Sequence, residues 1–202
     1  MVNPVDPKDT RIPDIGPGYP KWGHRRLTHF ARLMLARFGW VIETPYPDVK
    51  RSVVVIAPHT SNWDFIVGVG VALALDIRPA FIGKHTLFRW PLGTLMRRLG
   101  GIPVNRKKTE GLVPRVAARI RAREEIVLAI APEGTRKGAS RWRTGFYHIA
   151  AQSGIPIVPC LLSLKDRTVQ FGAPLLPGAD PASDLAQIAA FYQLEHLGAQ
   201  NE

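Results

Sequence analysis

A histidine and an aspartate five positions apart, His59 and Asp64, are the first residues in this sequence that could do chemistry. An imidazole titrates near neutral pH. A carboxylate bonded to one ring nitrogen fixes the tautomer and leaves the other nitrogen as a general base. By spacing alone, most such pairs are structural. Their place in the chain argues for chemistry, because they lie between an apolar run at residues 53–57 and a longer one that begins at Phe65.

The two apolar runs predict a strand and then a helix around this pair. Residues 53–57 are short, β-branched and bounded by charge and proline, which is typical of a buried strand. Residues 60–62 are all possible N-caps for a helix. We therefore expect His59 on a strand-to-helix loop at the carboxyl end of a strand, where open α/β sheets place their ligands. Asp64 falls near the first helical turn, where the helix dipole favours a carboxylate.

A second polar loop follows another apolar run, residues 126–131, which also predicts a buried strand. This loop contains Glu133 and Arg136, and it should leave the sheet at the same edge as the first loop. One interpretation is structural, with Glu133 paired to Arg136 or to another arginine. The other is that Arg136, together with Arg106, binds a phosphate through charge-assisted, fork-shaped hydrogen bonds.

Other reactive groups form no recognisable motif. The sequence has no G-x-S-x-G nucleophile elbow and no G-x-x-x-x-G-K-[ST] phosphate loop. Its six histidines show no metal-ligand spacing. The single cysteine, Cys160, excludes an internal disulfide, fits a reducing compartment and lies in an apolar run, so we expect an inert buried thiol.

The alternation of apolar segments predicts an α/β fold: a single domain with a mostly parallel mixed sheet flanked by helices. Strands are expected at residues 51–57, 79–84, 102–106, 126–131, 155–162 and 168–171. Helices are expected at residues 21–40, 63–76, 85–99 (interrupted near Pro91), 109–125, 145–152 and 183–196. Residues 1–20 are rich in proline and glycine and should form an extended arm before the domain at residues 21–202.

The charge of the chain implies an anionic partner. There are 27 Lys and Arg against 16 Asp and Glu, a net charge of +11. Residues 21–40 carry apolar side chains at helical spacing and five basic residues with no acid, which predicts a basic amphipathic N-terminal helix. Such a helix either packs its apolar stripe on the domain or lies in a lipid interface with its arginines toward anionic headgroups, and the two roles are compatible.

Four blocks of the sequence resemble the glycerolipid acyltransferases, the family of the 1-acyl-sn-glycerol-3-phosphate acyltransferases. Residues 59–64 match the family's H-x-x-x-x-D block, and residues 101–106 resemble its glycine-led short strand that ends in arginine. Residues 133–136 match its third block letter for letter, and residues 155–159 resemble its proline-punctuated apolar strand. The blocks occur in the family's order, and the chain resembles the short, monotopic branch.

The resemblance implies an O-acyltransferase of phospholipid biosynthesis. A fatty acyl group would pass from acyl-CoA or acyl carrier protein to the free hydroxyl of a lysophospholipid, first of all 1-acyl-sn-glycerol-3-phosphate, giving phosphatidic acid. His59 would be the general base, oriented by Asp64. The substrate-binding residues implied by the blocks are Arg106, Glu133, Gly134, Thr135 and Arg136. Neither a metal nor a cofactor is implied beyond the thioester co-substrate.

Several alternatives stay open at this point. The acceptor could be another lyso-lipid, the reaction could be transacylation between phospholipids, or the chain could be a non-catalytic basic membrane-binding protein. The expected partners are the lysophospholipid acceptor, the acyl donor and an anionic membrane surface. Nucleic acid is not expected, because the basic region lacks regularly interleaved aromatics.

The expected location is the cytoplasmic face of the membrane, where the chain would be peripheral and monotopic. The N-terminal residues contain no apolar core of the kind that a secretory signal has. The longest uninterrupted apolar run, residues 65–75, is too short to span a bilayer. We therefore expect the chain to meet the membrane from one side.

Overall fold

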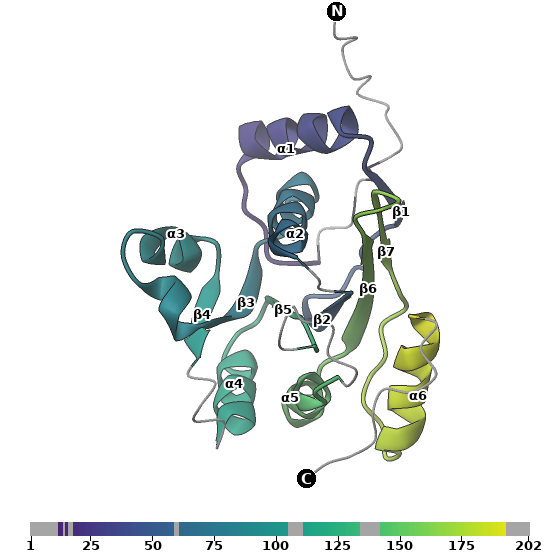
Figure 1. Ribbon diagram of the computed structural model, residues 1–202. Coiled ribbons are helices and arrows are strands. Elements are labelled where there is room, and N and C mark those ends of the chain that lie inside the picture. Colours follow the sequence, from purple (N-terminus) through teal and green to yellow (C-terminus); the bar gives the residue numbers. More distant parts are fainter. Residues whose placement is uncertain are drawn as a thin grey trace, which may run out of the picture.

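The computed structural model describes residues 12–13, 15, 18–58, 61–104, 111–133 and 142–192. Its strands form one seven-stranded sheet in the order β1-β7-β6-β2-β5-β3-β4 (Figure 1). Neighbouring strands are parallel except β6 and β7, which confirms the predicted α/β domain with a mostly parallel mixed sheet. The strands are β1 (Val41–Thr44), β2 (Arg51–Ala57), β3 (Pro79–Lys84), β4 (Gly101–Val104), β5 (Ile126–Ile130), β6 (Ile157–Ser163) and β7 (Thr168–Phe171).

Helices cover both faces of this sheet (Figure 1). They are α1 (Arg25–Arg37), α2 (Asn62–Ala74), the 3-10 helix η1 (His85–Phe88), α3 (Gly93–Arg98), α4 (Leu112–Arg121), α5 (Gly145–Ser153) and α6 (Pro181–Phe191). The strand order explains which helices cover which face. From β2 through β3 to β4 the chain moves in one direction across the sheet, and from β4 through β5 to β6 it moves back. Because connections between parallel strands are right-handed, the helices of these two stretches lie on opposite faces. One side therefore carries α1, α2, η1 and α3, which we call the α1–α3 layer, and the other carries α4, α5 and α6 (Figure 1).

The hydrophobic core lies on both sides of the central strands. Along β2, Val54 packs into the cluster beneath the α1–α3 layer, with Leu75 among its members. Its neighbours Val53 and Val55 pack into the opposite cluster, which includes Phe146 of α5. This alternation follows from the period of two along a strand. A central parallel strand buried on both faces explains why residues 53–57 read as a continuous apolar run.

A helix forms within the predicted range, but α1 spans only Arg25–Arg37 and is shorter than residues 21–40. Lys21 instead makes an antiparallel bridge with Ile77, and the backbone N–H of Trp22 donates to the Asp76 carbonyl at 3.2 Å. Ala31 of α1 belongs to the core cluster that includes residues of α2. Part of the apolar stripe of α1 therefore packs in the protein core.

The predicted arm, residues 1–20, lies mostly outside the described residues. Where it is described, Ile12 and Tyr19 are buried, and the Tyr19 hydroxyl donates to the Leu75 carbonyl at 3.3 Å. None of the helices in the described ranges combines the length and the apolar character needed to cross a membrane.

Candidate active site at the carboxyl edge of the sheet

The two polar loops leave the sheet at the same edge. Strands β2 and β5 are parallel neighbours, with Val55 beside Ile130. On its other side, β2 pairs in parallel with β6, where Val55 lies beside Pro159. The segments that follow β2 and β5 must therefore emerge together at the carboxyl edge, as the sequence predicts. In doubly wound sheets this edge is where ligands bind.

Asp64 is held at this edge by the start of α2. It is the third residue of the helix and only 3% exposed. Ser61 is the N-cap: its hydroxyl accepts from the Trp63 backbone N–H at 3.0 Å, and its own N–H donates to the Asp64 carboxylate at 2.6 Å. This capping box satisfies backbone donors at the helix start and fixes the carboxylate in one place. The positive end of the helix dipole stabilises the buried charge.

Glu133 begins the second loop and is also buried, at 8% exposure. The base of the loop is closed where the backbone N–H of Arg143 donates to the Pro132 carbonyl at 2.9 Å. Beside this closure, the Trp142 ring packs edge-on against the Tyr192 ring, with centroids 4.9 Å apart. Both ends of the loop are thus anchored, one on β5 and the other on the end of α6.

Tyr192 links this loop to the strand that leads to His59. Its hydroxyl donates to the Val55 carbonyl at 2.6 Å and accepts from the Cys160 backbone N–H at 2.9 Å. Burial raises the pKa of Tyr192, so the hydroxyl stays protonated and keeps its donor. Sequence reasoning missed this residue. A tyrosine among alanines near the end of a predicted helix was the available signal, since a buried tyrosine needs a partner.

Cys160 is a buried thiol. The thiol is buried on β6, and burial raises its pKa to about 12. It is therefore protonated at neutral pH and cannot serve as a thiolate nucleophile. The predicted burial of the thiol is confirmed, and the raised pKa agrees with the expectation that it is inert.

The other residues assigned to the site from the sequence lie outside the described residues: His59, Arg106, Gly134, Thr135 and Arg136. Of the predicted set, the structure describes Asp64 and Glu133, on segments that follow neighbouring strands. Strand β2 ends two positions before His59, and β4 ends two positions before Arg106.

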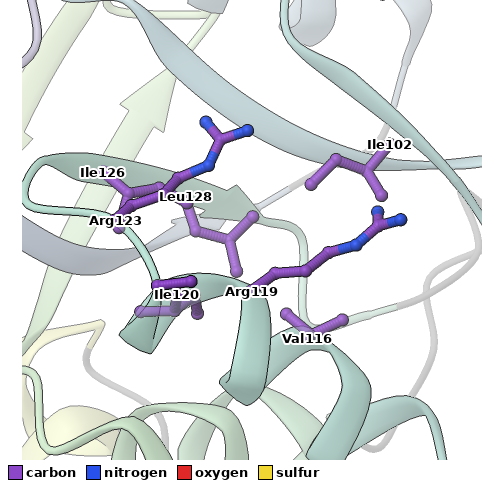
Figure 2. Close-up of a pocket in the computed structure, with 8 residues that line it drawn as sticks. Ile102, Val116, Arg119, Ile120, Arg123, Ile126 and Leu128 are labelled. Atoms are coloured by element: carbon purple, nitrogen blue, oxygen red, sulfur yellow. The ribbon is translucent and has the colours of Figure 1, made fainter.

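A cavity of about 480 Å³ lies on the face of the sheet that α4 covers, between the end of α4 and strands β4 and β5 (Figure 2). Its lining is mixed: Ile102 and Val116 are among the apolar residues, and the side chains of Arg119 and Arg123 also line it. The cavity includes the first residue of β5, Ile126. It thus lies toward the amino end of that strand, whereas the candidate site lies beyond the carboxyl end.

A family model described as "Acyltransferase" matches residues 40–163. The match takes in β2, the capping box of Asp64 and the loop that begins at Glu133. The chain belongs to the acyltransferase family. The resemblance to the glycerolipid acyltransferases that the four sequence blocks indicate is confirmed.

This acyltransferase-family chain is similar to several proteins named 1-acyl-sn-glycerol-3-phosphate acyltransferase. It is 28% identical to the Haemophilus influenzae protein over 136 residues, which are 62% of this chain and 55% of that protein. It is 29% identical to the Escherichia coli protein over 142 residues, 65% of this chain and 56% of that one. With the Limnanthes alba protein it shares 29% over 138 residues, 65% of this chain and 48% of that one. The chain spans about half the length of the curated relatives it matches.

The fold of this acyltransferase-family chain is similar to a solved structure. The crystal structure of the 1-acyl-sn-glycerophosphate (LPA) acyltransferase PlsC from Thermotoga maritima matches it with a TM-score of 0.59. The match covers 88% of this chain and 80% of that one, at 18% sequence identity. Likeness at this identity shows the fold, and it agrees with the single α/β domain described above.

Proposed function

We propose that this chain is an O-acyltransferase of phospholipid biosynthesis. A fatty acyl group passes from acyl-CoA or acyl carrier protein to the free hydroxyl of 1-acyl-sn-glycerol-3-phosphate, giving phosphatidic acid. The observation that carries the proposal is the buried Asp64, fixed at the carboxyl edge of β2 inside the stretch that the family matches. The names of the relatives support the choice of acceptor.

The proposed mechanism is direct transfer assisted by a general base. The His59 imidazole takes the proton from the acceptor hydroxyl as its oxygen attacks the thioester carbonyl carbon. The tetrahedral intermediate then breaks its carbon–sulfur bond, and the departing thiolate receives the proton from the imidazolium. Asp64 orients the ring and stabilises the imidazolium while it exists. Because the acceptor attacks directly, the mechanism uses no serine or cysteine nucleophile, no metal and no cofactor.

The acceptor phosphate is the group that the second loop is proposed to bind. Arg106 and Arg136 each offer a planar guanidinium that can make two parallel hydrogen bonds to phosphate oxygens. In the proposal, Glu133, Gly134 and Thr135 shape the loop around that phosphate. Binding a phosphate remote from the reacting hydroxyl favours the reaction mainly by orienting the acceptor. The last part of the proposal is peripheral attachment to the cytoplasmic face of an anionic membrane, because both substrates can reach the enzyme there.

The experiment that tests this function compares acceptors that differ in one group. The full chain is offered acyl-CoA or acyl carrier protein thioester with 1-acyl-sn-glycerol-3-phosphate, or with the matched 1-acylglycerol that lacks the phosphate. We expect turnover of the phosphorylated acceptor to exceed that of 1-acylglycerol, with Arg136→Ala removing most of the difference. His59→Ala should abolish turnover of both acceptors.

Several results would count against the proposal. Turnover of neither acceptor, or equal turnover of both, would contradict the assigned acceptor. Faster turnover of a different lysophospholipid, or acyl transfer between phospholipids without a thioester, would establish one of the alternatives instead. Vesicle binding with no turnover of any acceptor would favour a non-catalytic membrane-binding protein.

A further inference from the structure

Exposed large hydrophobic side chains gather on one side of the sheet. The described part of the chain has ten of them, and nine lie in or beside the helices of the α1–α3 layer. The exception is Leu176, which lies between β7 and α6. The nine are Leu27, Phe30, Phe38, Trp63, Ile66, Leu87, Trp90, Leu92 and Leu95. Concentrations of exposed apolar surface mark faces that meet a protein partner or a membrane.

The most exposed of these side chains, Trp90, lies on the segment from η1 through α3, residues 85–98, which we call the η1–α3 segment. This segment connects β3 to β4 at the end of the sheet (Figure 1). Trp90 is 93% exposed, and Leu87, Leu92 and Leu95 are exposed as well. Phe88 is the one large side chain of η1 that is buried.

Phe88 holds the segment so that its other apolar side chains stay outside. A Cβ on Gly101 of β4 would lie 2.7 Å from the Phe88 ring, so the ring occupies the space that a side chain would need there. A Cβ on Gly93 would lie 2.2 Å from the Phe88 carbonyl oxygen, so only glycine allows α3 to begin this close to η1. Arg97 donates to the same carbonyl at 3.4 Å and lies over the ring. Trp90, two positions after the buried Phe88, lies at the surface.

The charge around this apolar surface is positive. Residues 77–109 contain no Asp or Glu, and Lys84, Arg89 and Arg98 flank the exposed side chains of the η1–α3 segment. Apolar side chains surrounded by arginine and lysine are typical of segments that lie in the interface of an anionic membrane. Tryptophan is enriched at that interface, because its ring is apolar and its N–H can reach water or headgroups. The cores of protein–protein interfaces, in contrast, are depleted of charged residues.

We propose that the η1–α3 segment is a membrane anchor that inserts Trp90, Leu92 and Leu95 into an anionic lipid surface, with Arg89 and Arg98 at the headgroups. This surface is separate from the stripe of α1 that packs inside the protein at Ala31. Since β3 leads directly into the segment, docking would bring the carboxyl edge of the sheet to the membrane. Delivery of a lipid acceptor to that edge is a consequence that rests on the proposed function, whereas the docking itself does not.

Vesicle co-sedimentation of the full chain tests the anchor without any turnover. Vesicles of phosphatidylcholine alone are compared with vesicles that also contain phosphatidylglycerol. We expect binding to the anionic vesicles, about tenfold weaker for Trp90→Ala because the tryptophan no longer buries its ring. Leu176→Ser, which alters the exposed leucine outside the α1–α3 layer, should bind like the unchanged chain.

The charge of the anchor is tested with matched arginines. Arg89→Gln and Arg98→Gln should each weaken binding to anionic vesicles roughly fivefold, because a basic residue near such a surface contributes about 1 kcal/mol. Arg119→Gln, on the other side of the sheet, should have a much smaller effect. Undiminished binding of Trp90→Ala would overturn the anchor, and so would an equal loss for Leu176→Ser. Acyl transfer to an acceptor dispersed in detergent should be the same in Trp90→Ala as in the unchanged chain, so a failure of the proposed reaction can be told apart from a failure of the anchor.

Discussion

The backbone N–H of Ser61 donates to the Asp64 carboxylate across 2.6 Å. This bond closes the capping box of α2, so the helix that Asp64 helps to begin also determines where its carboxylate stands. In the proposed mechanism, a carboxylate positioned in this way loses little freedom when the His59 imidazolium forms. Asp64 is thus preorganised by local structure and needs no substrate to place it.

Removing the cap should loosen this arrangement. Ser61→Ala deletes the hydroxyl that accepts from Trp63, and we expect the free energy of unfolding to fall by about 1 kcal/mol. Acyl transfer should slow by about three- to tenfold, because Asp64 is less firmly held. Asp180→Ala removes the N-cap of α6 and is the matched control. It should lower stability by a similar amount and leave kcat/KM unchanged; equal slowing by both variants would show that the effect is not specific to the site.

Tyr192→Phe isolates the hydroxyl that joins two strands. The phenylalanine ring can still pack against Trp142, but the Val55 carbonyl and the Cys160 N–H each lose the hydrogen bond to the Tyr192 hydroxyl. Chemical denaturation should show a loss of about 1–3 kcal/mol. Tyr147→Phe provides the comparison: its hydroxyl bonds to Asp184, which keeps the Gly178 N–H and is not fully buried. A larger loss for Tyr147→Phe than for Tyr192→Phe would contradict this account.

The buried Cys160 thiol should make the free energy of unfolding depend on pH in the alkaline range. In the folded chain burial raises the pKa of the thiol from 9.0 to about 12, so the folded state holds this proton more tightly than the unfolded state does. The stabilising contribution is therefore complete below pH 9 and is lost as the pH rises toward 12. Denaturation measured between about pH 8 and pH 11 should show a steeper loss in the unchanged chain than in Cys160→Ala. The buried tyrosines remain in both chains, so identical slopes would argue against a buried thiol.

The central strands can be predicted from the sequence because their environment is uniform. Strands β2, β3 and β7 begin and end at the predicted residues, and the interruption near Pro91 separates η1 from α3 as expected. Strand β1, Val41–Thr44, was not predicted. It lies at the edge of the sheet with only Ile42 buried, and it forms by pairing with β7, where Val41 lies beside Thr168. A short apolar pattern in the sequence does not indicate which distant strand it will pair with.

The candidate site, like the sheet, has residues that the sequence predicts and residues that it does not. Residue types and their place after strands were enough to predict Asp64 and Glu133 at one edge, because parallel neighbours must end together. The capping box is also local, and Ser61 is one of the three possible N-caps at residues 60–62. Tyr192 could be suspected as a buried tyrosine, but its partner could not be predicted, since Val55 is 137 positions away. The outward-facing Trp90 likewise depends on Phe88 packing against Gly101, a contact between separate elements.

One substitution tests the central claim most directly. Asp64→Asn keeps an oxygen that can accept the Ser61 N–H, so the capping box survives while the charge is removed. Asp180→Asn makes the same change at the N-cap of α6, where the carboxylate accepts from two backbone N–H groups at 3.0 and 3.3 Å. The measurement is kcat/KM for acyl transfer to 1-acyl-sn-glycerol-3-phosphate. We predict a fall of about a hundredfold or more for Asp64→Asn and no change for Asp180→Asn; an Asp64→Asn chain as active as the Asp180→Asn chain would contradict the account.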